Sequence, residues 1–152
     1  MSMISRIVLD SSLLIEYFKQ NKIELLDFLL KAEFVELCIN STVLSKEAYH
    51  WLARKGSKVP RSLQQAKQIP KIMRDDNLLD FLSQFTVLPS DNRIVPIYLD
   101  LMQRYNLLPN DALIVVTAKL HDIPTIASFD PDFESACQGE GIRLIREVSD
   151  LA

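Results

Sequence analysis

The chain contains 152 residues, of which 48% are hydrophobic and 24% are charged, a balance typical of a folded protein rather than a disordered one. Its length predicts one domain over residues 1–152, and its net charge of −3 argues against a protein that simply coats nucleic acid. It contains no apolar run of about 18 residues and no signal-peptide layout, so we expect a cytoplasmic protein without a membrane partner. Cys38 and Cys137 fit neither a disulfide framework nor a zinc knuckle and are expected to be reduced thiols.

Strands and helices are expected to alternate along the chain. The expected strands cover residues 4–9, 35–39, 85–88, 125–128 and 142–145. The expected helices cover residues 13–18, 23–31, 42–54, 61–74, 78–85, 93–105 and 109–120, with Pro70 as a kink or a boundary. This alternation predicts a three-layer α/β/α sandwich with a central parallel sheet of four to five strands. In such sheets the functional crevice lies beyond the carboxyl ends of the strands.

The helix expected over residues 109–120 is predicted to lie in the core. Its length and its Pro-Asn-Asp start favour a helix over a buried strand, and its nearly unbroken apolar run to Leu120 predicts that the helix is buried. Asn110 can cap the free backbone donors of the first turn. Asp111 lies in that turn, where an acid is favoured by roughly 0.3–1 kcal/mol. Asp111 by itself therefore also fits an ordinary electrostatic role.

Glu47 is the unusual residue of the helix expected over residues 42–54. An apolar stripe on this helix is formed by Val43, Leu44, Ala48, Trp51 and Leu52. Glu47 falls inside the stripe, one turn after Val43 and one turn before Trp51. A buried carboxylate is costly unless it is paired or bound to a metal ion. A structural ion pair with Arg54 and a functional role are both compatible with this position.

Further acids are expected at one edge of the sheet. Asp10 follows the first strand, Asp130 follows the fourth, and Asp111 opens the helix that leads into the fourth strand. Crowded carboxylates raise one another's pKa values, and a divalent cation removes this repulsion. Sites made of carboxylate oxygens suit Mg²⁺ or Mn²⁺. These ions lower the pKa of an attacking water and stabilise the charge of a phosphoryl displacement.

Other chemistries find little support in the sequence. His50 and His121 lack the spacing of zinc ligands, and the three glycines form no phosphate-binding loop. The chain also has no Gly-x-Ser-x-Gly nucleophile motif. Eight of the 17 basic residues fall between residues 46 and 74, against the single acid Glu47. Such a run is either a solvated helical face or a surface that contacts phosphates.

Four segments, in this order, resemble the motifs of the PIN domain family, the metal-dependent ribonuclease fold of which VapC-type toxins are the commonest small members. The segments are Ile7-Val-Leu-Asp-Ser-Ser-Leu-Leu-Ile-Glu-Tyr-Phe18, Ser41-Thr-Val-Leu-Ser-Lys-Glu47, Asn110-Asp-Ala-Leu-Ile-Val-Val-Thr-Ala118 and Ser128-Phe-Asp-Pro-Asp-Phe133. The third segment, which carries Asp111, is the most specific. The order and spacing of the four make the resemblance strong.

The resemblance implies a set of site residues and a function. The catalytic and metal-binding acids would be Asp10, Glu47, Asp111 and Asp130, with Ser11 and Ser128 as supporting hydroxyl groups. Asp132 competes with Asp130 for the fourth acidic position, and Asp130 is favoured because it directly follows the expected strand. The implied activity is Mg²⁺- or Mn²⁺-dependent hydrolysis of single-stranded or structured RNA that leaves a 5′-phosphate. The implied partners are RNA, a second copy of the chain in a homodimer and, for a toxin, a small antitoxin protein.

Two alternatives to a toxin ribonuclease are considered. A catalytically silent PIN-like module would bind RNA or protein without turnover, but all four acids are present here. A phosphatase of the haloacid-dehalogenase type would need a second Asp two residues after Asp10, where Ser12 stands. The basic stretch from Lys55 to Arg74 matches no family motif and is interpreted as an insert that contacts RNA or flanks a dimer. The candidate RNA-binding residues are Arg54, Lys55, Lys58 and Arg61.

Overall fold

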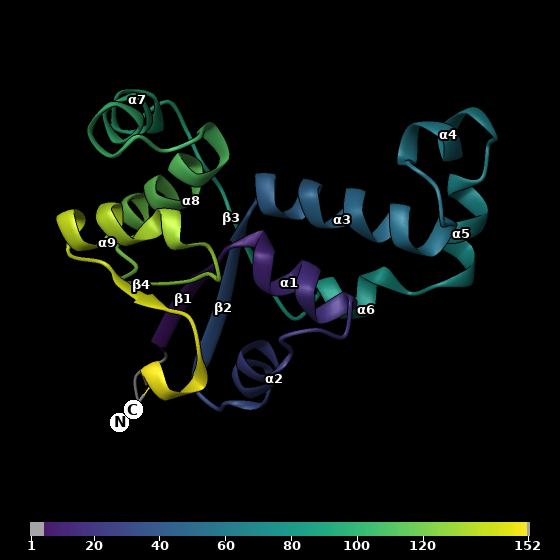
Figure 1. Cartoon of the computed structure of the whole chain (residues 1–152), viewed down its shortest axis with the longest axis horizontal. Helices are drawn as coiled ribbons and strands as arrows, with labels where there is room; N and C mark the ends of the chain where they lie inside the picture. The colour runs from purple at the N-terminus through teal and green to yellow at the C-terminus, as the bar shows by residue number, and fades with distance from the viewer. Residues whose placement is uncertain (1–4, 152) are drawn as a thin grey trace.

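The computed structural model describes residues 5–151, which form a five-stranded parallel sheet between two layers of helices (Figure 1). The strands are β1 (Ser5–Leu9), β2 (Val35–Asn40), β3 (Thr86–Leu88), β4 (Thr125–Ala127) and β5 (Arg143–Ile145). They lie in the order β3-β2-β1-β4-β5. This arrangement confirms the three-layer α/β/α fold predicted from the sequence. Residue 4, the expected start of the first strand, lies outside the described residues.

The order of the strands places a topological switch point between β1 and β4. From β1 the chain proceeds to β2 and β3 on one side of the sheet, and then returns to β4 and β5 on the other side of β1. Crossovers between parallel strands are almost always right-handed, so the two directions put their helices on opposite faces. Ligands of such sheets bind beyond the carboxyl ends of the strands at the switch point. A site is therefore expected where β1 and β4 end.

Each face of the sheet has its own helical layer (Figure 1). One layer contains α1 (Ser11–Phe18), α2 (Glu24–Lys31) and α3 (Ser41–Gly56). The other contains α8 (Pro109–Leu120) and α9 (Glu134–Glu140), with α7 (Ile94–Tyr105) packed on α8. The described residues also form two short 3-10 helices, η1 (Pro131–Phe133) before α9 and η2 (Val148–Leu151) after β5.

Helix α8 is buried, as its apolar run predicted. The residues that it buries are Ala112, Ile114, Val115, Val116, Thr117 and Ala118. Pro109 starts the helix, at a position where its missing N–H costs no helical hydrogen bond. The predicted cap was wrong: Leu108 is the N-cap residue, no side chain caps the helix, and Asn110 lies inside the first turn. Cys38 and Cys137 are free and buried.

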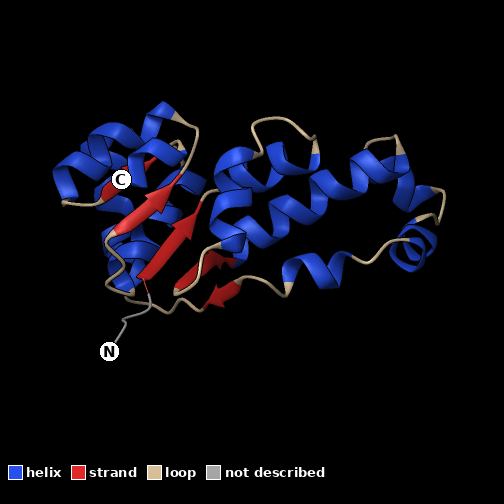
Figure 2. Cartoon of the chain, turned by 90° about the horizontal axis from the view of Figure 1, so that it is seen from below, coloured by secondary structure: helices blue, strands red, loops and turns tan. Residues whose placement is uncertain are grey.

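Beyond the sheet, α3 continues into a helical arm, which also contains α4 (Pro60–Gln65) and α5 (Ile69–Asp75) (Figure 2). Helix α6 (Leu78–Leu82) returns the chain to the sheet layer, where Phe81 packs on Tyr17 and Phe18 of α1. The single helix expected over residues 61–74 is two helices, because the chain turns at Lys67, whose φ is 58°, and Pro70 then begins α5 in its first turn. In the described part of the chain, no helix is long and apolar enough to cross a membrane.

Gly56 allows the arm to pack against the end of α3. A Cβ atom at this position would lie 2.5 Å from a methyl group of Leu63 and 2.9 Å from one of Ile72. Both distances are shorter than van der Waals contact, so the ends of the Leu63 and Ile72 side chains would have to move to accommodate a larger residue. The absence of a side chain at Gly56 therefore permits this close packing.

Candidate metal centre

Asp10 lies directly after β1, at the switch point of the sheet. Its backbone N–H donates a 3.0 Å hydrogen bond to the carbonyl of Ala127 in β4. One oxygen of its carboxylate accepts a 2.8 Å hydrogen bond from the hydroxyl of Ser128, and the hydroxyl of Ser11 lies 3.5 Å from the other oxygen. All three side chains are buried. The two serines proposed as supporting groups thus lie against the Asp10 carboxylate.

Ser128 also connects the loop after β4 with the start of α1. Its hydroxyl accepts a 3.0 Å hydrogen bond from the backbone N–H of Asp130 and lies 3.4 Å from the hydroxyl of Ser12. The Ser12 hydroxyl accepts a 3.1 Å hydrogen bond from the backbone N–H of Phe129. Ser12 was not predicted as a site residue. In the sequence, its position in the pair of serines that follows Asp10 is the one feature that could have indicated this role.

Asp111, Asp130 and Asp132 form a carboxylate cluster. One oxygen of each lies within 4.8 Å of those of the other two. Burial raises the pKa of Asp111 to about 6, and the negative charges of Asp10, Asp130 and Asp132 act in the same direction. The positive charge of Lys46 opposes this shift without cancelling it. The start of α8 and the loop after β4 therefore bring carboxylates together at the end of β1.

Asp130 and Asp132 differ in their surroundings. One oxygen of Asp130 accepts a 2.9 Å hydrogen bond from the backbone N–H of Asp132 and caps η1. The side chain of Asp130 is partly buried, whereas that of Asp132 is exposed. Strand β4 ends at Ala127, one residue earlier than expected, so neither acid directly follows it. Both acids lie beside Asp111, and both are candidates for the fourth acidic position.

Glu47 does not belong to the carboxylate cluster. Its side chain is 1% exposed, and neither of its oxygens has a hydrogen-bond partner among residues 5–151. The ion pair considered with Arg54 is therefore not formed. Burial alone raises the pKa of Glu47 to about 7. Glu47 and Arg54 line a cavity of about 280 Å³ between α1 and α3. Because neither oxygen of Glu47 has a hydrogen-bond partner, this carboxylate is buried without a group that compensates its charge.

Asn40 joins α3 to α8 at the same edge of the sheet. Its side-chain oxygen accepts a 2.8 Å hydrogen bond from the N–H of Val43 and caps α3. Its amide nitrogen donates to the carbonyl of Leu113 at 3.3 Å and to the hydroxyl of Thr117 at 3.2 Å. The sequence pattern does not indicate the contacts with α8, because these partners lie 73 and 77 positions away.

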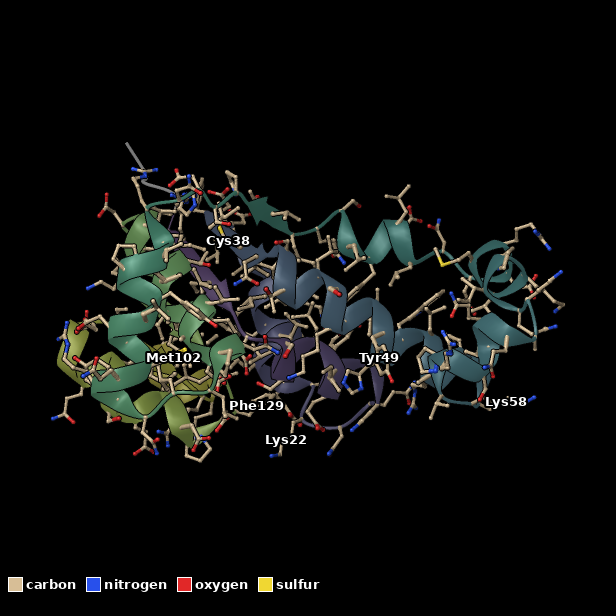
Figure 3. All side chains as sticks on the ribbon, turned by 90° about the horizontal axis from the view of Figure 1, so that it is seen from above. Lys22, Cys38, Tyr49, Lys58, Met102 and Phe129 are labelled. Carbon is tan, nitrogen blue, oxygen red and sulfur yellow. The ribbon has the colours of Figure 1, made fainter. Side chains whose placement is uncertain are left out.

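The candidate RNA-binding residues lie on the arm. They are Arg54 and Lys55 at the end of α3, Lys58 after it and Arg61 in α4. Lys55 pairs with Asp76 at 3.5 Å, and Arg61 donates to Gln64 at 3.2 Å. A helix rises about 1.5 Å per residue, so roughly 20 Å of α3 separates Lys55 from the end of β2. Figure 3 shows Lys58 far from Phe129, the neighbour of Asp130, so the arm and the acids form separate regions.

The residues of the carboxylate cluster fit a divalent cation. Mg²⁺ and Mn²⁺ prefer carboxylate oxygens, and three such groups meet here with Asp10 close by. The raised pKa of Asp111 shows that its charged form lacks compensation from the protein. A bound cation would supply that charge. The cluster is therefore a candidate metal centre.

The family model described as "PIN domain" matches residues 7–138. The chain is also 33% identical to Ribonuclease VapC2 of Methanocaldococcus jannaschii over 132 residues, which cover 86% of this chain and 88% of that protein. Ribonuclease VapC6 of the same organism is 27% identical over 155 residues, which cover 94% and 98% of the two chains. The chain belongs to the PIN domain family, as its four motifs predicted.

Solved structures share the fold. A toxin–antitoxin complex from Klebsiella pneumoniae has a TM-score of 0.59 at 19% identity, covering 93% of this chain and 98% of the other. VapBC2 from Rickettsia felis, bound to a DNA fragment from its promoter, has a TM-score of 0.60 at 17% identity, with coverages of 91% and 96%. FitAcB from Neisseria gonorrhoeae gives 0.60 at 17% identity, with coverages of 92% and 96%.

Proposed function

We propose that the protein is the endoribonuclease toxin of a toxin–antitoxin pair and that it hydrolyses RNA with the help of Mg²⁺ or Mn²⁺. The observation that carries the proposal is the cluster of Asp111, Asp130 and Asp132 at the switch point of a PIN-domain sheet. Two relatives that match most of the chain are named ribonucleases. One solved structure of the same fold is a toxin–antitoxin complex.

The three clustered acids would hold the cation, with Asp10 beside them. When bound, Mg²⁺ or Mn²⁺ lowers the pKa of an attacking water and stabilises the negative charge that develops on the phosphate. Both ions usually keep water ligands, and the partial exposure of the cluster is compatible with them. Glu47 is proposed as a further acid of the site, because both of its oxygens are buried without a partner.

Hydrogen bonds within the protein hold the acids in position for the proposed hydrolysis. In the hydrolysis, a water oxygen bonds to phosphorus while the bond from phosphorus to the 3′ oxygen breaks, which leaves a 5′-phosphate and a 3′-hydroxyl. The hydroxyl of Ser128 fixes the carboxylate of Asp10 and the backbone of Asp130 at the same time. This arrangement places the acids before substrate arrives, so little reorganisation is needed during the reaction.

A catalytically silent PIN-like module that binds RNA or protein is the alternative. Such a module would have no use for crowded carboxylates, which destabilise the fold when no cation is bound. The presence of Asp10 together with the three clustered acids therefore favours the enzyme.

The proposal also covers partners and location. As a toxin, the protein would form a homodimer, would be held inactive by a small antitoxin protein, and would meet its RNA substrate in the cytoplasm. The resemblance to VapC-type toxins and the named toxin–antitoxin complex of the same fold support these assignments.

Cleavage of a labelled RNA by the purified protein tests the proposed activity. Wild type, Asp111→Asn and Asp27→Asn are compared in Mn²⁺ and in EDTA. Asp27 is a matched control, because it is an acid on α2 that pairs with Lys31. We expect cleavage that requires Mn²⁺, disappears in Asp111→Asn and persists in Asp27→Asn. Cleavage that survives both EDTA and Asp111→Asn would contradict the proposal, and RNA binding without any cleavage would favour the silent module.

A further inference from the structure

A polar hollow lies beside the carboxylate cluster, and none of the acids proposed to bind the cation lines it. It has a volume of about 440 Å³ and is lined by Ser41, Thr42, Ser45, Lys46 and Tyr49 of α3 and by Asn110 of α8. Asn110 directly precedes Asp111, so the hollow and the cluster share the start of α8. Lys46 is close to both, because it lines the hollow and its charge acts on Asp111.

The polar lining has the chemistry that recognises a phosphate and a sugar. Within residues 5–151, no ion pair involves Lys46, so its ammonium group is available to an anion. The hollow also presents the hydroxyls of three α3 residues and the amide of Asn110. Hydroxyl, amide and ammonium groups make most contacts to the phosphates and sugars of nucleic acids.

Tyr49 adds a flat apolar surface to this lining. Its side chain is 53% exposed, although it is a large aromatic group. The ring of His50 packs against it, with centroids 5.7 Å apart and planes at 78°. In the view of Figure 3, Tyr49 lies on α3 between Phe129, beside the acids, and Lys58 on the arm. An exposed aromatic ring next to a polar, basic hollow is the arrangement on which unpaired bases stack.

We propose that this hollow, the α3–α8 subsite, holds the nucleotide next to the cleaved phosphodiester bond, with its phosphate on Lys46 and its base on Tyr49. The inference rests on the proposed ribonuclease function and assigns to it two residues that contact the substrate. A base can stack on a side chain only when it is unpaired. Of the single-stranded and structured RNAs that the family resemblance implies, the subsite accepts a strand that is unpaired beside the cleaved bond.

The test is the binding of a fluorescein-labelled single-stranded RNA to the full chain in EDTA, measured by anisotropy over a range of salt concentrations. Tyr49→Ala is expected to weaken binding by about 5- to 150-fold, the effect of losing one stacked base, whereas Tyr49→Phe retains binding. Lys46→Met is expected to reduce the slope of log K against log salt by about 0.7, the value for one phosphate contact on a single strand. Lys31→Met, which removes a lysine that pairs with Asp27 on α2, should leave the slope unchanged.

The inference and the ribonuclease proposal can fail separately. Binding that depends on Tyr49 and Lys46 without cleavage in Mn²⁺ would support the subsite and contradict the ribonuclease. Cleavage with the same KM in wild type and in Tyr49→Ala, together with unchanged binding in both variants, would overturn the subsite and leave the ribonuclease in place. Thermal melting of each variant confirms that the comparison is made between folded proteins.

Discussion

The hydroxyl of Ser128 donates a 2.8 Å hydrogen bond to the carboxylate of Asp10, and this contact joins residues 118 positions apart in the sequence. Asp10 follows β1 and Ser128 follows β4, so the bond spans the switch point of the sheet. The same hydroxyl accepts from the N–H of Asp130. A single buried oxygen atom therefore sets the relative position of two acids of the candidate metal centre.

Removal of this hydroxyl should weaken both the fold and the site. In Ser128→Ala the carboxylate of Asp10 and the N–H of Asp130 lose a partner, and an unsatisfied buried polar group costs roughly 1–3 kcal/mol. We expect the free energy of unfolding to fall by about that amount, and the affinity for Mn²⁺ to fall about 10- to 100-fold, as for other groups that orient metal ligands. Chemical denaturation and calorimetry measure the two effects. Ser135→Ala, at an exposed site on α9, is the control, and equal losses in both variants would contradict this role.

The two acids of the loop after β4 should contribute unequally. Asp130 raises the pKa of Asp111 more than Asp132 does, and its position is fixed by backbone hydrogen bonds. We therefore predict that Asp130→Asn lowers the pKa of Asp111 from about 6 further than Asp132→Asn does, and that it weakens Mn²⁺ binding more. Carboxyl NMR titration of metal-free protein measures the first effect. A larger change in Asp132→Asn would assign the fourth acidic position to Asp132.

Glu47 should make the metal-free protein less stable as the pH rises. Its pKa is about 7 in the fold and near 4.5 in the unfolded chain. Between these values the unfolded state releases a proton that the folded state retains, so the free energy of unfolding falls with rising pH. The loss is on the order of 3 kcal/mol above pH 7 and is absent below pH 4.5, where both states are protonated.

Glu47→Gln removes this titration with little change in shape. In EDTA, the variant should be more stable than wild type above pH 7 and similar to it near pH 4.5. Denaturant unfolding across this range measures the difference. Parallel pH profiles for the two proteins would show that Glu47 is already compensated in the fold.

The basic residues of the arm should contribute to the binding of long RNAs and not to that of short ones. Roughly 20 Å of α3 separates them from the acid-bearing edge of the sheet, which a short oligonucleotide does not span. Substitution of Lys55, Lys58 and Arg61 by Gln, which leaves Arg54 beside Glu47 intact, is expected to reduce the salt dependence of binding for long RNA and to leave cleavage of a short RNA unchanged. An equal effect on both RNAs would place the arm at the active site.

The sequence predicted the features that depend on local pattern. Alternating apolar runs gave the parallel sheet, and the position of Glu47 inside an apolar stripe predicted its burial correctly. The acids after β1 and at the start of α8 were expected at one edge because parallel strands end together. A kink or boundary at Pro70 was predicted within residues 61–74, and Pro70 does lie in the first turn of α5, but the turn at Lys67 was not predicted because it has no glycine to mark it.

Contacts between distant segments could not be predicted in this way. The bond from Ser128 to Asp10 and the bonds from Asn40 to α8 depend on side-chain positions that only the folded structure defines. The same is true of the α3–α8 hollow, whose lining combines residues 41–49 with Asn110. The separation of Glu47 from the carboxylate cluster was also unexpected, since the motif alone does not fix the direction of a side chain.

Calorimetric titration of the metal-free protein with Mn²⁺ is the most direct test of the candidate metal centre. Metal binding must displace the proton of Asp111, whose pKa is about 6. We predict that Mn²⁺ affinity increases as the pH rises through this value, that binding releases protons, and that Asp111→Asn abolishes binding while Asp27→Asn does not. Equal Mn²⁺ affinity in wild type and Asp111→Asn, or an affinity independent of pH, would contradict a metal centre at this cluster.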